Sequence, residues 1–211
     1  MATQLVKVLD VGCGDGVHWR YLRRLGNERL SYTGVDISAT VIQRLQQTED
    51  ERQDKFIQMD VTALAGPDET YDLVFAFGVV AYTNDPAHCF DELYRVCKPG
   101  GWIGVWIYPQ QTGLGGFVFS ATRWLCQQAG PFWSRRIADL IVPFLGILPT
   151  RSKMNLRNST WRQCREVILV NIMPKQLTFF QRDEVADWFM THNVDLRFED
   201  PDNPITIWGC K

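Results

Sequence analysis

The chain has 211 residues, of which 45% are apolar and 22% are charged, with 22 basic residues against 24 acidic ones. A chain of this length and balance suits one folded domain with a substantial core, and its composition excludes an intrinsically disordered protein. The net charge of -2 gives no overall basic character, so a nucleic-acid partner is not expected.

Strand-like and helix-like segments alternate through the first half of the chain. Short apolar and β-branched runs predict five strands, at 7–11, 32–36, 56–60, 71–77 and 102–108. Apolar residues at helical spacing predict three helices, at 17–25, 38–47 and 85–97. Ser38 is expected to cap the second helix, and Pro99-Gly100-Gly101 is expected to end the third. This alternation predicts a parallel sheet with helices on both faces.

The alternation stops after Pro109. Residues 110–175 are rich in Trp, Phe, Leu and Arg and show no clear order of strands and helices. Within them, segment 110–165 has eight basic residues and one acidic residue, so it carries a net charge of +7 and the rest of the chain carries -9. The overall charge is therefore an average over two unlike parts.

Regular structure is expected to return near the end of the chain. The pattern predicts a helix at 182–192 and two strands near 195–198 and 205–208. The turn-forming run Asp200-Pro201-Asp202-Asn203-Pro204 separates these strands and predicts an antiparallel hairpin.

Six cysteines and three histidines are scattered along the chain without a C-x-x-C pair or a spacing typical of metal ligands. We therefore expect reduced thiols, no metal site and a cytoplasmic location. The first residues lack the long apolar region of a signal peptide. The most apolar stretch, 137–148, is shorter than the roughly 20 residues of a membrane-spanning helix.

The most informative motif is the run Val8-Leu9-Asp10-Val11-Gly12-Cys13-Gly14-Asp15-Gly16. A strand that enters a glycine-rich turn and then a helix lets the backbone approach a ligand closely, with helix N–H groups facing it. The dinucleotide-binding pattern G-x-G-x-x-G would require a glycine at Val17. Asp10 would also repel a pyrophosphate but attract an ammonium group. An NAD-dependent oxidoreductase is therefore disfavoured.

Two further aspartates end predicted strands. Asp36 closes the second strand and could accept hydrogen bonds from both hydroxyls of a ribose. Asp60 closes the third strand, where it could meet an adenine amino group. A single aspartate after a strand is more often a cap or turn residue. Three of them in neighbouring strands, beside a glycine turn, indicate a nucleoside-containing ligand.

Five motifs in order then resemble those of the class I S-adenosylmethionine-dependent methyltransferases. They are V-L-D-V-G-C-G-D-G at 8–16, G-V-D-I-S at 34–38, Q-M-D-V at 58–61, Y-D-L-V-F-A-F-G-V-V at 71–80 and E-L-Y-R-V-C-K-P-G-G-W at 92–102. The resemblance implies an α/β, Rossmann-like doubly wound sheet of seven strands in the order 3-2-1-4-5-7-6. Strand 7 would be antiparallel, and a helical insertion would follow strand 5.

The resemblance also implies S-adenosyl-L-methionine as the cofactor and S-adenosyl-L-homocysteine as the product. Gly12 and Gly14 would flank the methionine part, and Asp36 would hold the ribose. Asp60 and Val61 would frame the adenine, and Phe77 or Gly78 would lie beside the sulfonium. The cofactor-binding residues expected on this basis are Asp10, Gly12, Cys13, Gly14, Asp36, Ile37, Asp60, Val61, Phe77 and Gly78.

No general base stands out in the sequence. The related subgroup usually carries a histidine at position 81 or 82, where this chain has Ala81 and Tyr82. The candidate catalytic residues are His88, Tyr82 and Tyr108, for each of which packing or a surface position is an equal or better explanation. The other two histidines are expected to be an exposed His18 and a helix-terminal His192.

The resemblance implies methyl transfer to a small-molecule, sugar or lipid-linked acceptor. Oxygen is favoured over nitrogen because (D/N)-P-P-(Y/F), typical of exocyclic-amine methylation, is absent at 77–80. The alternative is a non-catalytic module that binds S-adenosylmethionine or S-adenosylhomocysteine within a larger assembly. The oligomeric state is left open.

One methyltransferase domain is expected, with a cofactor-binding half at 1–109, a helical substrate or lid insertion at 110–175, and a C-terminal helix and hairpin at 176–211. Aromatic residues mixed with arginines make segment 110–165 a candidate for peripheral membrane contact, against the alternative of a plain helical subdomain. The first strand begins about seven residues in. The insertion is therefore expected to replace the leading helix common in the family, unless the chain is a fragment.

Overall fold

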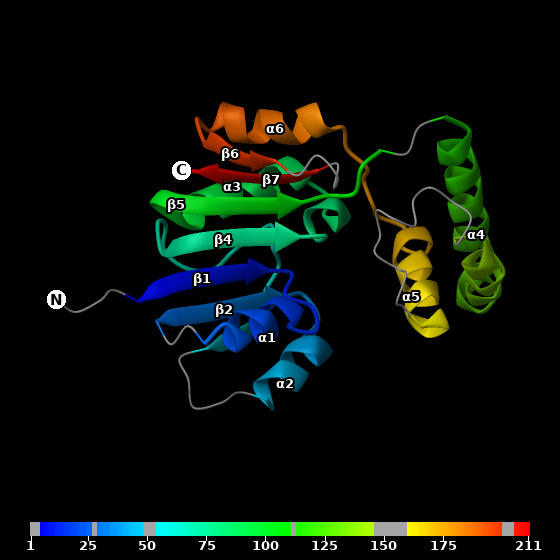
Figure 1. Cartoon of the computed structure of the whole chain (residues 1–211), viewed down its shortest axis with the longest axis horizontal. Helices are drawn as coiled ribbons and strands as arrows, with labels where there is room; N and C mark the ends of the chain where they lie inside the picture. The colour runs from blue at the N-terminus through cyan, green and yellow to red at the C-terminus, as the bar shows by residue number, and fades with distance from the viewer. Residues whose placement is uncertain (1–4, 27–28, 49–53, 111–112, 146–159, 200–204) are drawn as a thin grey trace. The chain divides into compact units, whose positions relative to one another are not determined.

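Seven strands form one sheet in the order β3-β2-β1-β4-β5-β7-β6 (Figure 1). The structure, a computed structural model, describes residues 5–26, 29–48, 54–110, 113–145, 160–199 and 205–211. The strands are β1 Val6–Val11, β2 Leu30–Asp36, β3 Lys55–Gln58, β4 Tyr71–Phe77, β5 Cys97–Trp106, β6 Asp195–Glu199 and β7 Thr206–Cys210. Strands β1 to β5 pair in parallel, whereas β7 is antiparallel to both β5 and β6. The predicted strand order and directions are confirmed.

Helices pack on both faces of this sheet. They are α1 Val17–Arg24, α2 Ala39–Gln46, α3 Pro86–Val96 and α6 Arg182–Thr191. Trp208 of β7 packs with the cluster that contains residues of α1 and α2. A Cβ on the next residue, Gly209, would lie 2.9 Å from Phe189 of α6. Because successive residues of a strand point to opposite faces, α6 covers the face away from α1 and α2.

Helix α1 is joined to the sheet by a buried carboxylate. Asp54 is 9% exposed. It accepts hydrogen bonds from Trp19 Nε1 at 2.8 Å, from Arg23 Nε at 2.8 Å and from the backbone N–H of Tyr32 at 3.3 Å. A second guanidinium nitrogen of Arg23 also contacts it. Helix α1 is therefore held at a fixed place over β2. Ser38 caps α2 by accepting from Val41 N–H, as predicted.

Two of the predicted boundaries place a residue or motif in the wrong element. Strand β3 ends at Gln58, so Asp60 lies in the following loop and not at the strand end. Strand β5 begins at Cys97, so Pro99-Gly100-Gly101 belongs to the strand and does not form a loop that ends α3. The reason is that this segment pairs with the distant carboxyl-terminal residue of the same chain. Gly100 N–H donates to Lys211 O, and Lys211 N–H donates to Gly101 O.

The chain divides into two compact units, one of residues 1–109 with 180–211 and a second of residues 110–179. The second unit contains α4 Gly113–Leu145, which bends at Gly130 where φ is 77°, and α5 Trp161–Ile172. The predicted helical insertion after β5 is thereby confirmed. Among the residues described, no helix combines the length and apolar character needed to cross a bilayer. Outside the described residues lie Arg151, Lys153, Arg157, the side chain of Phe144 and the turn at 200–204.

Candidate functional site

The carboxyl ends of β1, β2 and β4 meet at one edge of the sheet. Asp10 of β1 lies opposite Gly34 of β2 and Phe75 of β4. Two residues beyond these positions, in the direction of each strand, are Gly12, Asp36 and Phe77. The register therefore brings three of the predicted site residues to the same level, at the edge where α/β sheets bind ligands.

A glycine turn occupies the centre of this edge. Gly12, Gly14 and Gly16 all have positive φ, at 73°, 51° and 77°. The amides of Gly12 and Cys13 both donate to Val35 O, which anchors the turn to β2. A Cβ at residue 12 would lie 2.6 Å from Val79, whereas one at residue 14 would meet no described atom within 4 Å. The turn is thus packed on one side and open at Gly14.

Asp36 fixes the open side of the turn. Its Oδ2 accepts a hydrogen bond from Gly14 N–H at 3.0 Å, and its Oδ1 accepts one from Ser38 N–H at 2.9 Å. The carboxylate is half-buried. Since two carboxylate oxygens offer about four lone-pair sites, about two remain for further donors. Asp36 can therefore hold the turn and a diol together.

Asp10 is fully buried beneath the turn. Its Oδ2 accepts from Tyr32 OH and lies 3.2 Å from His18 Nδ1, whereas its Oδ1 is buried without a partner among the described residues. The hydrogen bond with Asp10 raises the pKa of His18, against the effect of burial. Burial, followed by the nearby Asp10 charge, raises the pKa of the Cys13 thiol to about 12, so Cys13 is held neutral.

The third predicted aspartate is largely a turn residue. Oδ1 of the exposed Asp60 accepts from Thr62 N–H at 2.9 Å and from Thr62 Oγ1 at 2.7 Å. These bonds lower the pKa of the Asp60 carboxyl. Beside it, Val61 is buried, and across the edge Ile37 is 68% exposed. An exposed isoleucine facing solvent at this edge is suited to covering a flat apolar ring.

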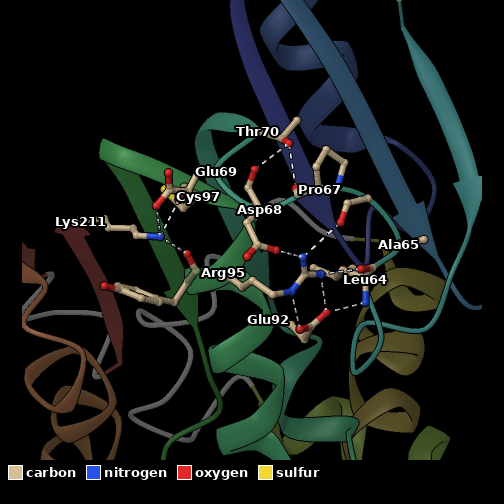
Figure 2. A network of polar contacts seen from close by, with 12 residues as sticks. Leu64, Ala65, Pro67, Asp68, Glu69, Thr70, Glu92, Arg95, Cys97 and Lys211 are labelled. Atoms are coloured by element: carbon tan, nitrogen blue, oxygen red, sulfur yellow. Dashed lines mark hydrogen bonds and ion pairs between the residues drawn. The ribbon is translucent and has the colours of Figure 1, made fainter.

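The loop that carries Asp60 is fastened at its far end (Figure 2). Arg95 of α3 donates to Leu64 O at 2.6 Å, to Gly66 O at 3.1 Å and to Asp68 Oδ1 at 2.7 Å. Glu92 binds the same guanidinium and accepts from Leu64 N–H at 2.8 Å. The pairing holds the pKa of Glu92 below its usual value. The irregular loop is thereby tied to α3 by side chains.

Aromatic residues gather beyond the ends of β4 and β5. Gly78, with φ 71°, donates its N–H to Trp106 O at 2.8 Å. The ring of Tyr108 lies 4.7 Å from that of Trp106 and 5.9 Å from that of Tyr82, centroid to centroid. Two of the three candidate catalytic residues, Tyr82 and Tyr108, thus lie in ring contact with each other, and a Cβ built on Gly78 would lie 3.8 Å from the Tyr108 hydroxyl.

One of the three histidines lies in an environment that differs from the prediction. His88 lies in the first turn of α3, half-exposed, with its Nδ1 3.8 Å from Asp91 of the same helix. His192 follows α6, as expected, and its Nε2 lies 3.1 Å from Asp91. His18 was expected at the surface, but it is half-buried against Asp10 and Phe77. Its pairing with Asp10 spans the glycine turn, so no local pattern reveals it.

Comparison with known proteins gives the same picture. A family model described as "Methyltransferase domain" matches residues 9–105. A malonyl-[acyl-carrier protein] O-methyltransferase of Salmonella typhimurium is 34% identical over 98 residues, which cover 46% of this chain and 37% of that protein. A phosphatidylethanolamine N-methyltransferase of Cereibacter sphaeroides is 33% identical over 99 residues, which cover 45% of this chain and 47% of that protein. The chain thus spans less than half the length of these curated relatives.

Solved structures share the whole fold at low identity. The CurJ carbon methyltransferase aligns with a TM-score of 0.61 and 12% identity over 100% of this chain and 49% of that one. A methyltransferase from Aquifex aeolicus aligns with a TM-score of 0.56 and 13% identity over 100% of this chain and 83% of that one. Residues 9–105 thus match a methyltransferase domain, and the order of the strands is the one that the class I S-adenosylmethionine-dependent methyltransferase motifs predict.

Proposed function

We propose that this protein transfers the methyl group of S-adenosyl-L-methionine to a small-molecule, sugar or lipid-linked acceptor, and that S-adenosyl-L-homocysteine is the product. The observation that carries this proposal is the turn that is open at Gly14 and held there by the Asp36 carboxylate. The match to a methyltransferase domain makes the cofactor the expected ligand of such a turn.

The described residues fit this cofactor. Asp36 keeps acceptor capacity for the two ribose hydroxyls after binding its backbone donors. The exposed Ile37 and the buried Val61 offer apolar surface to the adenine. The space above Gly14 admits the methionine part, and the buried Asp10 carboxylate gives that end a negative charge that suits an ammonium group.

The bound cofactor would supply an activated methyl group on a positively charged sulfur. The chain's part is then mainly alignment, because an in-line displacement requires the acceptor atom, the methyl carbon and the sulfur to be collinear. Phe77 and Gly78 would border the sulfur end, and Gly78 carries no side chain that could block it. Tyr82 and Tyr108 would line the acceptor side, where a phenol can accept or donate a proton.

The acceptor atom is proposed to be oxygen. The segment at the end of β4 reads Phe77-Gly78-Val79-Val80, which lacks the side-chain amide or carboxylate and the prolines that hold an exocyclic amine. The names of two relatives specify an O-methyltransferase of malonyl-[acyl-carrier protein] and an N-methyltransferase of phosphatidylethanolamine. One of these names specifies a lipid as the acceptor, which is consistent with the lipid-linked acceptor in this proposal.

Calorimetric titration followed by a turnover assay tests the proposal. We expect binding of S-adenosyl-L-methionine and none of NAD. We then expect release of S-adenosyl-L-homocysteine with at least one member of a panel of phenols, sugars, hydroxy acids and lipid carboxylates. NAD binding without S-adenosyl-L-methionine binding would contradict the proposal. Tight cofactor binding without turnover on any acceptor would favour a non-catalytic binding module.

A further inference from the structure

Helix α4 exposes large apolar side chains along its length. Before the bend at Gly130, Phe117, Trp124 and Leu125 are 73%, 64% and 50% exposed. After the bend, Phe132, Trp133 and Leu140 are 64%, 60% and 71% exposed. We call these six residues the α4 apolar face. Their spacing within each segment places them on one side of the helix.

The other side of α4 already has its own core. Cys126, Ala138 and Val142 are buried in one cluster with residues of α5. Ser134 is buried as well, and its hydroxyl donates to Cys126 O at 2.9 Å, which fixes the bend. The parts of α4 before and after the bend thus each pack one side into the same core. The α4 apolar face lies on the opposite side. Such a face exceeds what a helix of a soluble unit normally leaves in water.

Positive charge accompanies the α4 apolar face. Arg135 and Arg136 are exposed next to Phe132 and Trp133, and the Arg136 guanidinium lies 5.7 Å from the centre of the Phe132 ring. The acidic residue of α4, Asp139, is engaged from α5, where Arg165 lies 3.5 Å away. In the described part of residues 110–179, six basic residues stand against two acidic ones. The unit has a positive balance, and two exposed arginines, Arg135 and Arg136, flank the α4 apolar face after the bend.

We propose that the α4 apolar face docks on an anionic lipid membrane surface. Tryptophan and phenylalanine favour the boundary between headgroups and acyl chains, and adjacent arginines attract anionic lipid. A second copy of the chain fits less well, because a symmetric contact through this face would bury Arg135 and Arg136, and the acidic residue of α4, Asp139, is already paired with Arg165. The docking is independent of methyl transfer, although it would bring the protein to lipid-borne acceptors.

Vesicle co-sedimentation of the full chain tests this docking. The probes are vesicles of phosphatidylcholine with and without phosphatidylglycerol, at low and high salt. The double variants are Phe132→Ser with Trp133→Ser and Arg135→Gln with Arg136→Gln. The control variants carry the same kinds of substitution at exposed residues of the other unit. Phe198→Ser in β6, at a residue that is 54% exposed, is the control for the aromatic variant. Arg24→Gln with Arg44→Gln, in α1 and α2, is the control for the arginine variant. Circular dichroism checks that each variant is folded.

We expect the unaltered protein to bind vesicles that contain phosphatidylglycerol and to lose binding at high salt. The double arginine variant should bind about 25-fold more weakly, and the double aromatic variant at least about ten-fold more weakly, while the controls bind normally. Absence of binding, equal binding to both vesicle types, or unchanged binding in folded α4 variants would overturn the proposal. So would dimerisation without lipid that the Phe132→Ser, Trp133→Ser variant abolishes.

Discussion

The Asp36 carboxylate holds the glycine turn and is proposed to bind the ribose, and substitution tests both contributions together. Replacement by alanine removes the acceptor for Gly14 N–H and Ser38 N–H together with the proposed acceptors for the ribose. Hydrogen bonds to a charged group contribute about 1.5–3 kcal/mol each, and the low end applies to this half-buried site. Asp36→Ala should therefore weaken S-adenosyl-L-methionine binding by about 1–3 kcal/mol, or about 5- to 150-fold.

Isothermal titration well below the midpoint of thermal unfolding measures this loss while the protein is folded. Asp36→Asn retains one oxygen acceptor and should lose less affinity than Asp36→Ala. Asp15→Ala is the matched control, because Asp15 lies in the same turn but its side chain is 68% exposed. The assignment of Asp36 to the ribose fails if Asp36→Ala and Asp15→Ala both bind the cofactor as the unaltered protein does.

Three further predictions concern stability. Asp54→Ala should lower the free energy of unfolding in urea by about 3–5 kcal/mol, because it leaves the Arg23 charge without its buried partner. Tyr32→Phe should lower it by about 1–3 kcal/mol, because the buried Asp10 loses a donor; an unchanged midpoint would contradict this. The hydrogen bond with Asp10 raises the pKa of His18 above its unfolded-state value of about 6.5, so protonated His18 stabilises the fold. This stabilisation is complete below the unfolded-state pKa and is lost as the pH rises through the folded-state pKa. The difference in the free energy of unfolding between the unaltered protein and His18→Gln should therefore shrink as the pH rises through the folded-state pKa.

Much of the scaffold follows from local pattern. Apolar runs ending in glycine or aspartate located β1, β2 and β4, and Ser38 marked the start of α2 because its capping bond is made within three residues. The family motifs supplied the strand order, which no local signal contains. Prediction was wrong at Pro99-Gly100-Gly101, because the strand there is extended by hydrogen bonds from Lys211, more than 100 residues away.

The site was less accessible to prediction than the fold. The glycine turn and Asp36 are encoded in short motifs, and their backbone contacts are local to the ends of β1 and β2. The environment of His18 and the approach of Tyr82 to Tyr108 depend on how elements pack. Contacts of this kind join residues at irregular separations along the chain. Hydrophobic periodicity and secondary-structure propensity therefore do not predict them.

The attachment of residues 64–70 to α3 has a consequence for hydrogen exchange. Loop amides outside regular structure normally exchange quickly. Here Leu64 N–H donates to Glu92, and the amides of Glu69 and Thr70 donate to Arg95 O and Val96 O. These three protons should exchange slowly and at the rate set by opening of the carboxyl-terminal turn of α3. The loop and that turn would then behave as one cooperative unit, and the proposed adenine end of the site would retain its shape between cycles of ligand binding.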